Sequence, residues 1–221
     1  MKLGEKQKLV MIGDSITDCG RKQPIGEGLF DAHGRGYVAL VQALLTAAYP
    51  ELGIRVVNMG CSGHTVRDLK GRWESDVIAL QPDWLSIMIG TNDVWRQYDQ
   101  PHMPESHVYL EEYEQTLDEL ITNTKRDVKV KGLVLMTPFY LEPNRTDQMR
   151  STMDQYGDAV RRLAIKHETL FVDTQAAFDR VLEHIYPATL AWDRVHPSAA
   201  GHAVLARALL HAVEYDYNRG L

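Results

Sequence analysis

The chain has 221 residues, of which 44% are hydrophobic and 24% are charged, and its formal net charge is −6. This length and composition predict one globular domain over residues 1–221, because no Gly/Ser-rich linker, repeat or low-complexity tract divides the chain. The acidic balance and the lack of a basic stripe argue against a nucleic-acid partner and against binding to an anionic membrane surface.

Apolar runs that alternate with segments of helical spacing predict a parallel α/β fold. The expected strands span residues 8–12, 54–58, 83–89, 132–137 and 170–173, and the expected helices span 36–48, 65–79, 109–125, 149–167, 174–185 and 198–213. Because crossovers between parallel strands are right-handed, these units predict a three-layer α/β/α sandwich resembling flavodoxin, with strand order 2-1-3-4-5. The stretches 94–108 and 138–148 lack a regular pattern, and we expect them to be loops beside a substrate pocket.

The first predicted strand ends in the turn Gly13-Asp14-Ser15-Ile16. A serine in this position projects from the carboxyl end of the sheet, where open α/β folds keep their ligand crevices. Taken alone, the same four residues also fit an ordinary turn. Ser15 is therefore a candidate nucleophile that needs a base and an orienting carboxylate from elsewhere in the chain.

Two later turns offer hydrogen-bond donors for the oxyanion that forms when a serine attacks a carbonyl. Residues 58–63 form a glycine-bearing turn after the second predicted strand, and residues 90–93 follow the third. Backbone N–H groups of the first turn and the side-chain amide of Asn92, together with the N–H of Ser15, would make a three-donor oxyanion hole. The predicted strand order brings these turns side by side at one edge of the sheet.

A base and its orienting group stand near the C-terminal end, where Asp193 precedes His196 by three residues. A serine hydroxyl becomes nucleophilic when a neutral imidazole accepts its proton, and a carboxylate on the other ring nitrogen fixes the tautomer. His64 is its main rival among the nine histidines, but only His196 of these two has an aspartate at this offset. We therefore expect Ser15, His196 and Asp193 to form a catalytic triad.

Together, the strings Gly-Asp-Ser, Asn-x-Gly-x-Ser-Gly, Gly-Thr-Asn-Asp and Asp-x-x-His-Pro follow the order and spacing of the GDSL or SGNH hydrolase family. The chain resembles this family over nearly its whole length, and Ile16 replaces the leucine of the family name without touching the chemistry. The motifs are most similar to those of the bacterial acetylxylan esterases of the family. The resemblance implies the SGNH hydrolase fold and the following functional positions: Ser15, Gly63, Asn92 and His196, with Asp193 as the third triad member.

The resemblance implies a serine esterase that uses no metal and no cofactor and removes short acyl groups through an acyl-enzyme. Its expected substrates are acetyl groups on xylose units of xylan or xylo-oligosaccharides. One alternative is a thioesterase or lysophospholipase of the same family, and another is a noncatalytic carbohydrate-binding protein on a hydrolase scaffold. Trp95 and Trp192 adjoin the motifs, and we expect both to bind substrate.

Cys19 and Cys61 are the only cysteines in the sequence, too few for the disulfide framework of a secreted domain, and we expect free thiols. Residues 1–7 carry charges where a signal peptide needs an apolar core, and no apolar run reaches transmembrane length. These features predict a cytoplasmic enzyme without a membrane partner. A homo-oligomer is an expectation that rests on the family resemblance alone.

Overall fold

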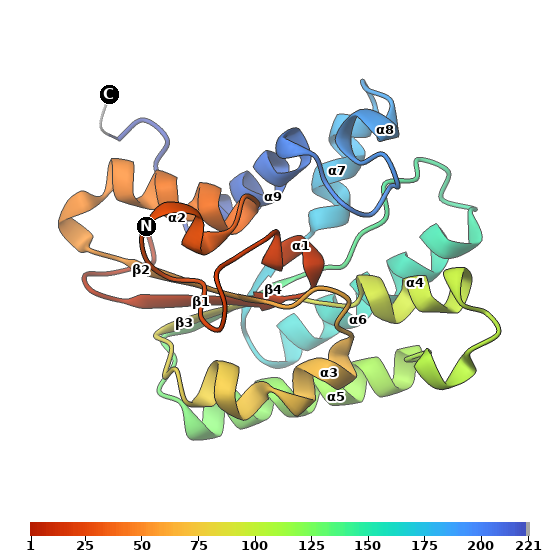
Figure 1. Cartoon of the computed structure of the whole chain (residues 1–221), viewed down its shortest axis with the longest axis horizontal. Helices are drawn as coiled ribbons and strands as arrows, with labels where there is room; N and C mark the ends of the chain where they lie inside the picture. Colours follow the sequence, from red (N-terminus) through yellow and green to blue (C-terminus); the bar gives the residue numbers. More distant parts are fainter. Residues whose placement is uncertain (220–221) are drawn as a thin grey trace.

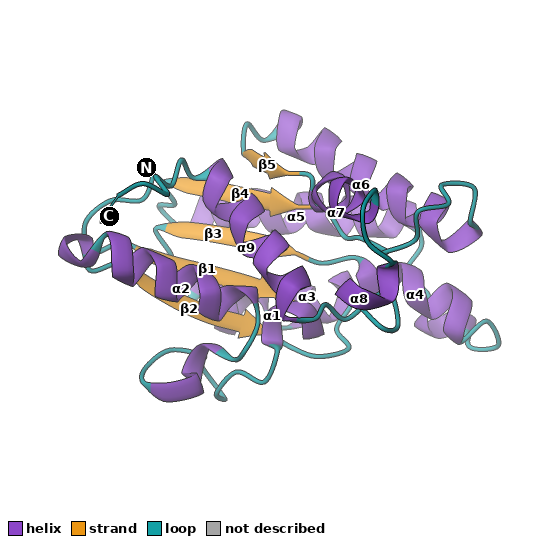
Figure 2. Cartoon of the chain, turned by 90° about the horizontal axis from the view of Figure 1, so that it is seen from above, coloured by secondary structure: helices purple, strands orange, loops and turns teal. Residues whose placement is uncertain are grey.

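Five parallel strands form one sheet in the order β2-β1-β3-β4-β5, which confirms the predicted fold class and strand order. The computed structural model describes residues 1–219, so the last two residues of the predicted domain lie outside the described part. Figure 2 shows the five strands in this order, with all arrows pointing the same way. The strands are β1 (Lys8–Gly13), β2 (Arg55–Gly60), β3 (Trp84–Met88), β4 (Gly132–Met136) and β5 (Leu170–Val172).

Helices cover both faces of the sheet (Figure 1). One face carries α2 (Tyr37–Ala48), α7 (Thr174–Leu182) and α9 (Ala199–Ala212), and the other carries α3 (Val66–Gly71), α5 (Leu110–Asp127) and α6 (Gln148–Lys166). Three short helices lie toward the carboxyl ends of the strands (Figure 2): α1 (Ser15–Asp18), α4 (Thr91–Asp99) and α8 (Pro187–Leu190). Single tight turns occur at Phe30–His33, Pro50–Leu52 and Pro104–Ser106, and a wide π turn occurs at Glu74–Ile78.

The strands supply both hydrophobic cores, because successive side chains point to opposite faces of a sheet. In β1, Val10 and Ile12 pack in the core with α3, α5 and α6, whereas Leu9 and Met11 pack in the core with α2, α7 and α9. All four side chains are fully buried. A strand that is buried on both faces has a continuous apolar sequence, which is why the apolar runs located the sheet.

Two expectations about the helices are wrong. The stretch 94–108, expected as a loop, begins inside α4, which starts at Thr91. The first turn of α4 buries the polar residues Asn92 and Asp93, which a hydrophobicity pattern does not mark as helical. The expected helix 65–79 is also interrupted, because α3 ends at Gly71 and the chain continues into the wide turn Glu74–Ile78.

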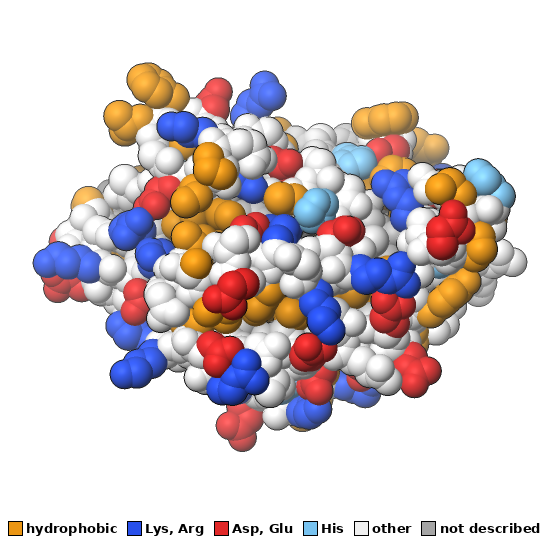
Figure 3. All heavy atoms as spheres, turned by 60° about the horizontal axis from the view of Figure 1, so that its bottom comes forward, with side chains coloured by type: hydrophobic (Ala, Val, Ile, Leu, Met, Phe, Trp, Pro, Cys, Tyr) orange, Lys and Arg blue, Asp and Glu red, His pale blue; other side chains and the backbone are white. Residues whose placement is uncertain are grey.

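The face of the molecule turned forward in Figure 3 has a mixed charge pattern, in which basic and acidic side chains are interspersed. Exposed ion pairs of this kind contribute little to stability individually, yet they leave the helix surfaces well solvated. The ion pairs that link neighbouring helices of the layer formed by α3, α5 and α6 are Arg67–Glu112, Lys70–Glu119, Arg162–Glu114 and Lys166–Asp118.

Among residues 1–219, no helix is long and apolar enough to cross a membrane.

The two ends of the described chain lie on the same side of the molecule, opposite the carboxyl ends of the strands (Figures 1 and 2). The backbone N–H of Lys2 donates to the carbonyl of Val213 at 2.8 Å. Strand β1 starts near this contact and α9 ends there. β1 and α9 therefore both run between the side that carries the chain ends and the side where the carboxyl ends of the strands lie.

Strand β2 ends at Gly60, which lies directly against α1. A Cβ atom at Gly60 would lie 2.1 Å from the backbone nitrogen of Asp18 and 2.6 Å from its Cα, far inside van der Waals contact. The side-chain amide of Asn58 donates to the carbonyl of Thr17 at 2.7 Å and reinforces this contact. The helix that carries Ser15 therefore rests on the bare backbone of β2.

Asp93 joins α4 to α3 inside the protein. Its Oδ1 accepts the backbone N–H of Val66 at 3.0 Å, and its Oδ2 is buried without a hydrogen-bond partner among the described residues. Burial raises the pKa of Asp93 from 3.8 to about 7, with smaller contributions from the carboxyl groups of Asp14 and Asp68. The ionised form of Asp93 is therefore costly in the folded state.

We expect Gly60→Ala to lower the free energy of unfolding by about 1–3 kcal/mol, the usual cost of overpacking a close contact. Because the added methyl group meets backbone rather than a flexible side chain, α1 must shift, and kcat should fall as Ser15 moves. Urea unfolding measures the first effect, and the rate of acetyl-ester hydrolysis, the activity expected from the motifs, measures the second. Gly71→Ala is the control, since a Cβ there meets nothing within 4 Å. Wild-type stability and kcat in Gly60→Ala would contradict the close approach.

The pKa of Asp93 predicts a stability difference that depends on pH. A carboxyl pKa raised by folding stabilises the protein below its ordinary value of 3.8, and this contribution is lost as the pH rises through about 7. Relative to Asp93→Asn, the wild-type protein should therefore lose stability between about pH 4 and pH 8.

Asp68→Asn is a control for which the pH dependence of the stability difference should have the opposite sign. Urea unfolding across the same pH range measures both variants. Burial opposes ionisation of Asp68, but hydrogen bonds from the backbone and hydroxyl of Thr65 lower its pKa overall. The Asp68 carboxylate therefore stabilises the protein above its ordinary pKa, and this contribution is lost as the pH falls. Parallel pH dependences for the two variants would contradict the assignment.

Candidate active site

Ser15 is the first residue of α1, directly after the carboxyl end of β1. Asp14 caps this short helix, since its Oδ1 accepts the backbone N–H of Ile16 at 2.9 Å. Asp14 is almost fully buried, and burial raises its pKa to about 6. Asp14 thus holds the turn together from inside, while the hydroxyl of Ser15 remains available to a partner on the outside.

That partner is His196. The Oγ of Ser15 lies 3.0 Å from Nε2 of His196, and Nδ1 of His196 lies 2.7 Å from Oδ2 of Asp193. A carboxylate accepts hydrogen bonds only, so the partner at Nδ1 assigns the ring proton to that nitrogen and leaves Nε2 as the acceptor for the serine proton. The structure therefore brings together the three residues expected to form a triad, in the order that base catalysis requires.

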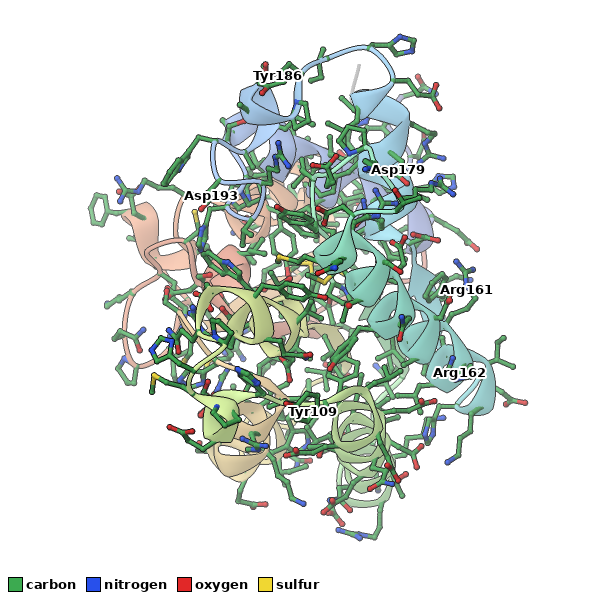
Figure 4. The ribbon with its side chains drawn as sticks, turned by 90° about the vertical axis from the view of Figure 1, so that its right-hand side faces the viewer. Tyr109, Arg161, Arg162, Asp179, Tyr186 and Asp193 are labelled. Atoms are coloured by element: carbon green, nitrogen blue, oxygen red, sulfur yellow. The ribbon has the colours of Figure 1, made fainter. Side chains whose placement is uncertain are left out.

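Asp193 is held in its ionised form by three donors. Although burial raises the pKa of this carboxyl group, hydrogen bonds from His196 and from the backbone N–H of Val195 lower it overall. Oδ1 of Asp193 accepts the backbone N–H of Val195 at 3.0 Å and that of His196 at 2.8 Å. In Figure 4, which faces the carboxyl edge of the sheet, Asp193 lies beside the pale red N-terminal ribbon, apart from Arg161 and Asp179.

The segment between Asp193 and His196 is fixed by the loop that follows β4. Arg194 has a φ of 65°, in the left-handed region, and its carbonyl accepts the backbone N–H of Leu141 at 3.0 Å. Its guanidinium also forms an ion pair with Glu142. Sequence patterns did not identify this pair, because Arg194 occupies an unspecified position of the Asp-x-x-His-Pro motif and Glu142 lies in no recognised motif. These contacts hold the turn in the one conformation that presents the imidazole to Ser15.

The three expected oxyanion donors lie on the turns that follow β1, β2 and β3. Among residues 1–219, the backbone N–H groups of Ser15 and Gly63 have no hydrogen-bond acceptor. Gly63 has a φ of 81°, a conformation that favours glycine. Nδ2 of Asn92 donates one proton to the carbonyl of His64 at 3.0 Å, which leaves its second proton free. These groups can supply hydrogen-bond donors to a developing oxyanion.

His64, the main rival for the base, is occupied otherwise. Its Nδ1 accepts a hydrogen bond from Nε of Arg72 at 3.1 Å, and its carbonyl accepts the Asn92 amide. Burial and the positive charge of Arg72 lower the pKa of His64. His64 therefore acts as a neutral hydrogen-bond acceptor beneath the Gly63 turn, with no carboxylate on its ring.

The two tryptophans expected to bind substrate lie in different surroundings. The Trp95 ring packs edge-on against His196, with 5.7 Å between the ring centroids, and it is partly buried by the core. Trp192 is 82% exposed and extends into solvent. Trp95 thus forms one side of the site, whereas Trp192 forms no wall within this chain. A substrate contact for either ring remains a prediction.

Both cysteines are free thiols, as expected. Sγ of Cys19 lies 3.5 Å from Nε2 of His202, whose Nδ1 accepts the backbone N–H of Tyr37 at 3.2 Å. The ring proton of His202 is therefore on Nε2, where it faces the sulfur, and burial lowers the pKa of His202 to about 4. A histidine in this state cannot take the thiol proton, so the pair does not form a second nucleophile.

The described residues contain no cluster of three or more His, Cys, Asp or Glu side chains that could hold a metal ion. The groups that the structure brings together at the site are a hydroxyl, an imidazole, a carboxylate and a set of N–H donors. This combination supports acyl transfer through a covalent serine ester.

Comparison with solved structures gives close matches over nearly the whole chain. The acetylxylan esterase Axe2 of Geobacillus stearothermophilus superposes with a TM-score of 0.95, at 65% identity and 98% coverage of both chains. LAE5, an alpha/beta hydrolase enzyme from the metagenome of Lake Arreo, gives a TM-score of 0.94 at 56% identity, with 97% of this chain and 98% of LAE5 covered.

Axe2 has also been solved as three catalytic mutants, in which a serine, an aspartate and a histidine are each replaced by alanine. The serine carries the number 15, and the aspartate precedes the histidine by three positions, as Asp193 precedes His196 in this chain.

Sequence comparison agrees with the structural matches. An acetylxylan esterase from Geobacillus stearothermophilus is 64% identical over 219 residues, which is 99% of each chain. The model of the GDSL-like lipase/acylhydrolase family matches residues 11–204. These findings confirm the resemblance found in the motifs. The chain belongs to the GDSL-like lipase/acylhydrolase family.

Proposed function

We propose that this chain is a serine esterase that removes acetyl groups from xylose units of xylan or xylo-oligosaccharides. The observation that carries the proposal is the hydrogen-bond chain from Ser15 through His196 to Asp193. The identity of 64% to an acetylxylan esterase supports the substrate. Axe2, one of the solved relatives, is an acetyl-xylooligosaccharide esterase.

In the first half of the reaction, Oγ of Ser15 attacks the carbonyl carbon of the acetyl group while Nε2 of His196 takes the serine proton. The carbonyl oxygen gains the negative charge, and the N–H groups of Ser15, Gly63 and Asn92 stabilise it. The tetrahedral intermediate collapses when the bond to the sugar oxygen breaks. His196 returns the proton to that oxygen, which leaves a free sugar hydroxyl and an acetylated Ser15.

In the second half, a water molecule attacks the acetyl-serine and His196 accepts its proton. The same donors stabilise the second oxyanion, and the bond between Oγ and the acyl carbon breaks as Oγ regains a proton. Acetate leaves and the enzyme returns to its starting state. Asp193 stays ionised throughout, and its negative charge stabilises the imidazolium of His196 that forms in each half of the reaction.

The exposure of the base suits a bulky leaving group. The side chain of His196 is 42% exposed, so a large part of the imidazole faces solvent. A sugar ring on the leaving oxygen can therefore remain outside the protein while its acetyl group reaches Ser15. The Trp95 ring beside His196 offers an apolar surface for that sugar.

The alternatives make different demands on the site. A thioesterase or lysophospholipase needs a long apolar channel for its acyl chain. A noncatalytic carbohydrate-binding protein needs no hydrogen-bonded serine, histidine and aspartate, and the complete arrangement of these three groups disfavours it. The cytoplasmic location, the homo-oligomer and the absence of nucleic-acid and membrane partners remain predictions.

Ser15→Ala should lower kcat on the order of 10⁶-fold, as removal of a triad nucleophile does elsewhere. A serine-directed phosphonylating reagent should label the wild-type protein once and should not label this variant. Ser62→Ala is the control for the site of labelling, since the Ser62 hydroxyl donates to Asp18 at 2.8 Å and has no histidine partner. Mass spectrometry of the labelled peptide locates the modification. Retention of full activity in Ser15→Ala would overturn the proposed mechanism.

The acyl group is tested with acetyl, butyryl and octanoyl esters of one leaving group. We expect kcat/KM to fall with chain length, and acetylated xylose and xylobiose to be better substrates than acetylated glucose. A lipase-like channel would instead raise kcat/KM with each buried methylene, by up to about 0.8 kcal/mol or fourfold. A preference for octanoyl esters would identify the thioesterase or lysophospholipase alternative.

A further inference from the structure

The proposed oxyanion donors come from three separate turns, and some group must fix the distances between these turns. The three turns follow β1, β2 and β3, and their lengths and sequences differ. A donor must lie within a few tenths of an ångström of its position to stabilise the transition state rather than the substrate. Pairing of the strands aligns only the residues before the turns.

One side chain contacts two of these segments directly and is linked to the third through His64. Arg72, at the end of α3, donates from Nη2 to the carbonyl of Gly13 at 2.8 Å and from Nη1 to the carbonyl of Met59 at 2.7 Å. Its Nε donates to Nδ1 of His64 at 3.1 Å. The carbonyl of His64 in turn accepts the side-chain amide of Asn92.

These contacts lie next to the proposed donors in the sequence. Gly13 precedes Ser15 by two residues, and its carbonyl also accepts the backbone N–H of Cys61 at 3.0 Å. His64 directly follows Gly63. One guanidinium therefore spans the Ser15 turn and the Gly63 turn, and it reaches Asn92 through a single intermediate residue.

The chemistry of arginine suits this position. A guanidinium is planar, and its N–H groups point in fixed directions, so three acceptors bound to it are held at set distances and angles. The Arg72 side chain is only 12% exposed, and Asp76 binds its Nη1 at 2.7 Å, which balances the charge and fixes the plane. A lysine would supply the positive charge but not the planar set of N–H donors in fixed directions.

We propose that Arg72 is a positioning residue for the oxyanion hole, which sets the relative places of the Ser15, Gly63 and Asn92 donors. This inference rests on the proposed esterase function and deepens it. It assigns Arg72 no contact with substrate. Arg72 acts through the backbone of Gly13 and through His64.

The first test is the effect of Arg72→Gln and Arg72→Lys on steady-state kinetics with an acetyl ester. Misplacement of a catalytic group by about 1 Å can cost on the order of 10² in rate, so we expect kcat to fall about 10- to 100-fold. KM should change less than about threefold, since ground-state binding does not use these donors. The kcat of Arg72→Lys should fall as well, because lysine lacks the planar set of N–H donors. Wild-type kcat in both variants would overturn the proposal.

Arg67 provides a matched control on the same helix. Its guanidinium also donates to two carbonyls, those of Glu105 and His107, and to the carboxylate of Glu112, but it faces away from the three turns. Arg67→Gln should therefore leave kcat within about twofold of the wild type. A fall in kcat equal to that of Arg72→Gln would show a general effect of losing an arginine from α3, which would contradict a specific role for Arg72.

A double-mutant cycle with Asn92→Ala separates positioning from a general loss of structure. If Arg72 acts through the donors, Arg72→Gln should have a smaller effect on kcat when Asn92 is already replaced. Arg67→Gln combined with Asn92→Ala should show no such coupling. Effects of Arg72→Gln and Asn92→Ala that multiply fully would overturn the proposal.

Asp76→Asn covers the case in which the Arg72 variants do not fold. It keeps the arginine but removes the carboxylate that orients it, and it should lower kcat in the same direction, by about 3- to 10-fold, with KM little changed. Unchanged kcat in this variant would count against the proposal. Failure of the esterase function itself is distinct, because only that failure would leave Ser15→Ala fully active.

Discussion

The proposed active site depends on the register of three parallel strands. β1 lies between β2 and β3, and Gly13 at its end pairs with Gly60 on one side and Met88 on the other. Parallel strands lie about 4.8 Å apart, so turns that leave three adjacent strands at the same level can all reach one small group. This register explains how residues 15, 63 and 92, widely separated in the sequence, can serve a single carbonyl oxygen.

His196, the proposed base, is positioned by contacts of a different kind. His196 belongs to a loop rather than to the sheet, and strand pairing does not determine its position. The left-handed conformation of Arg194 costs about 1–2 kcal/mol for a residue with a side chain. Its contacts with Leu141 and Glu142 offset that cost and tie the loop to the segment after β4. The nucleophile is thus positioned by backbone pairing, and the base is positioned by a few side-chain and loop contacts.

Most of the fold could be predicted from the sequence because both faces of the sheet are buried, so each strand is a continuous apolar run such as Leu9 to Ile12. The first turn of α4 escaped prediction because it buries Asn92 and Asp93, and polar residues do not mark a helix in a hydrophobicity pattern. A buried polar stretch beside a glycine turn reflects the needs of the site rather than those of the core.

The groups expected to form the site could be predicted for a different reason. Ser15, Asn92 and His196 lie in short motifs whose residue types are dictated by acyl-transfer chemistry. Arg72 lies in no such motif, and in the sequence it is one arginine of an expected helix. Its role depends on which carbonyls its guanidinium meets in three dimensions. The exposure of Trp192 is likewise a property of the folded chain, and adjacency to a motif did not predict it.

The pairing of Lys2 with Val213 has a practical consequence for attaching the enzyme to other molecules. Both described ends of the chain lie on the side opposite the carboxyl ends of the strands (Figure 2). A tether, a fused protein or a solid support joined at either end would therefore leave Ser15 and His196 facing away from the attachment. A short peptide could also link the two ends, which would allow the chain to be opened at an exposed loop as a circular permutant.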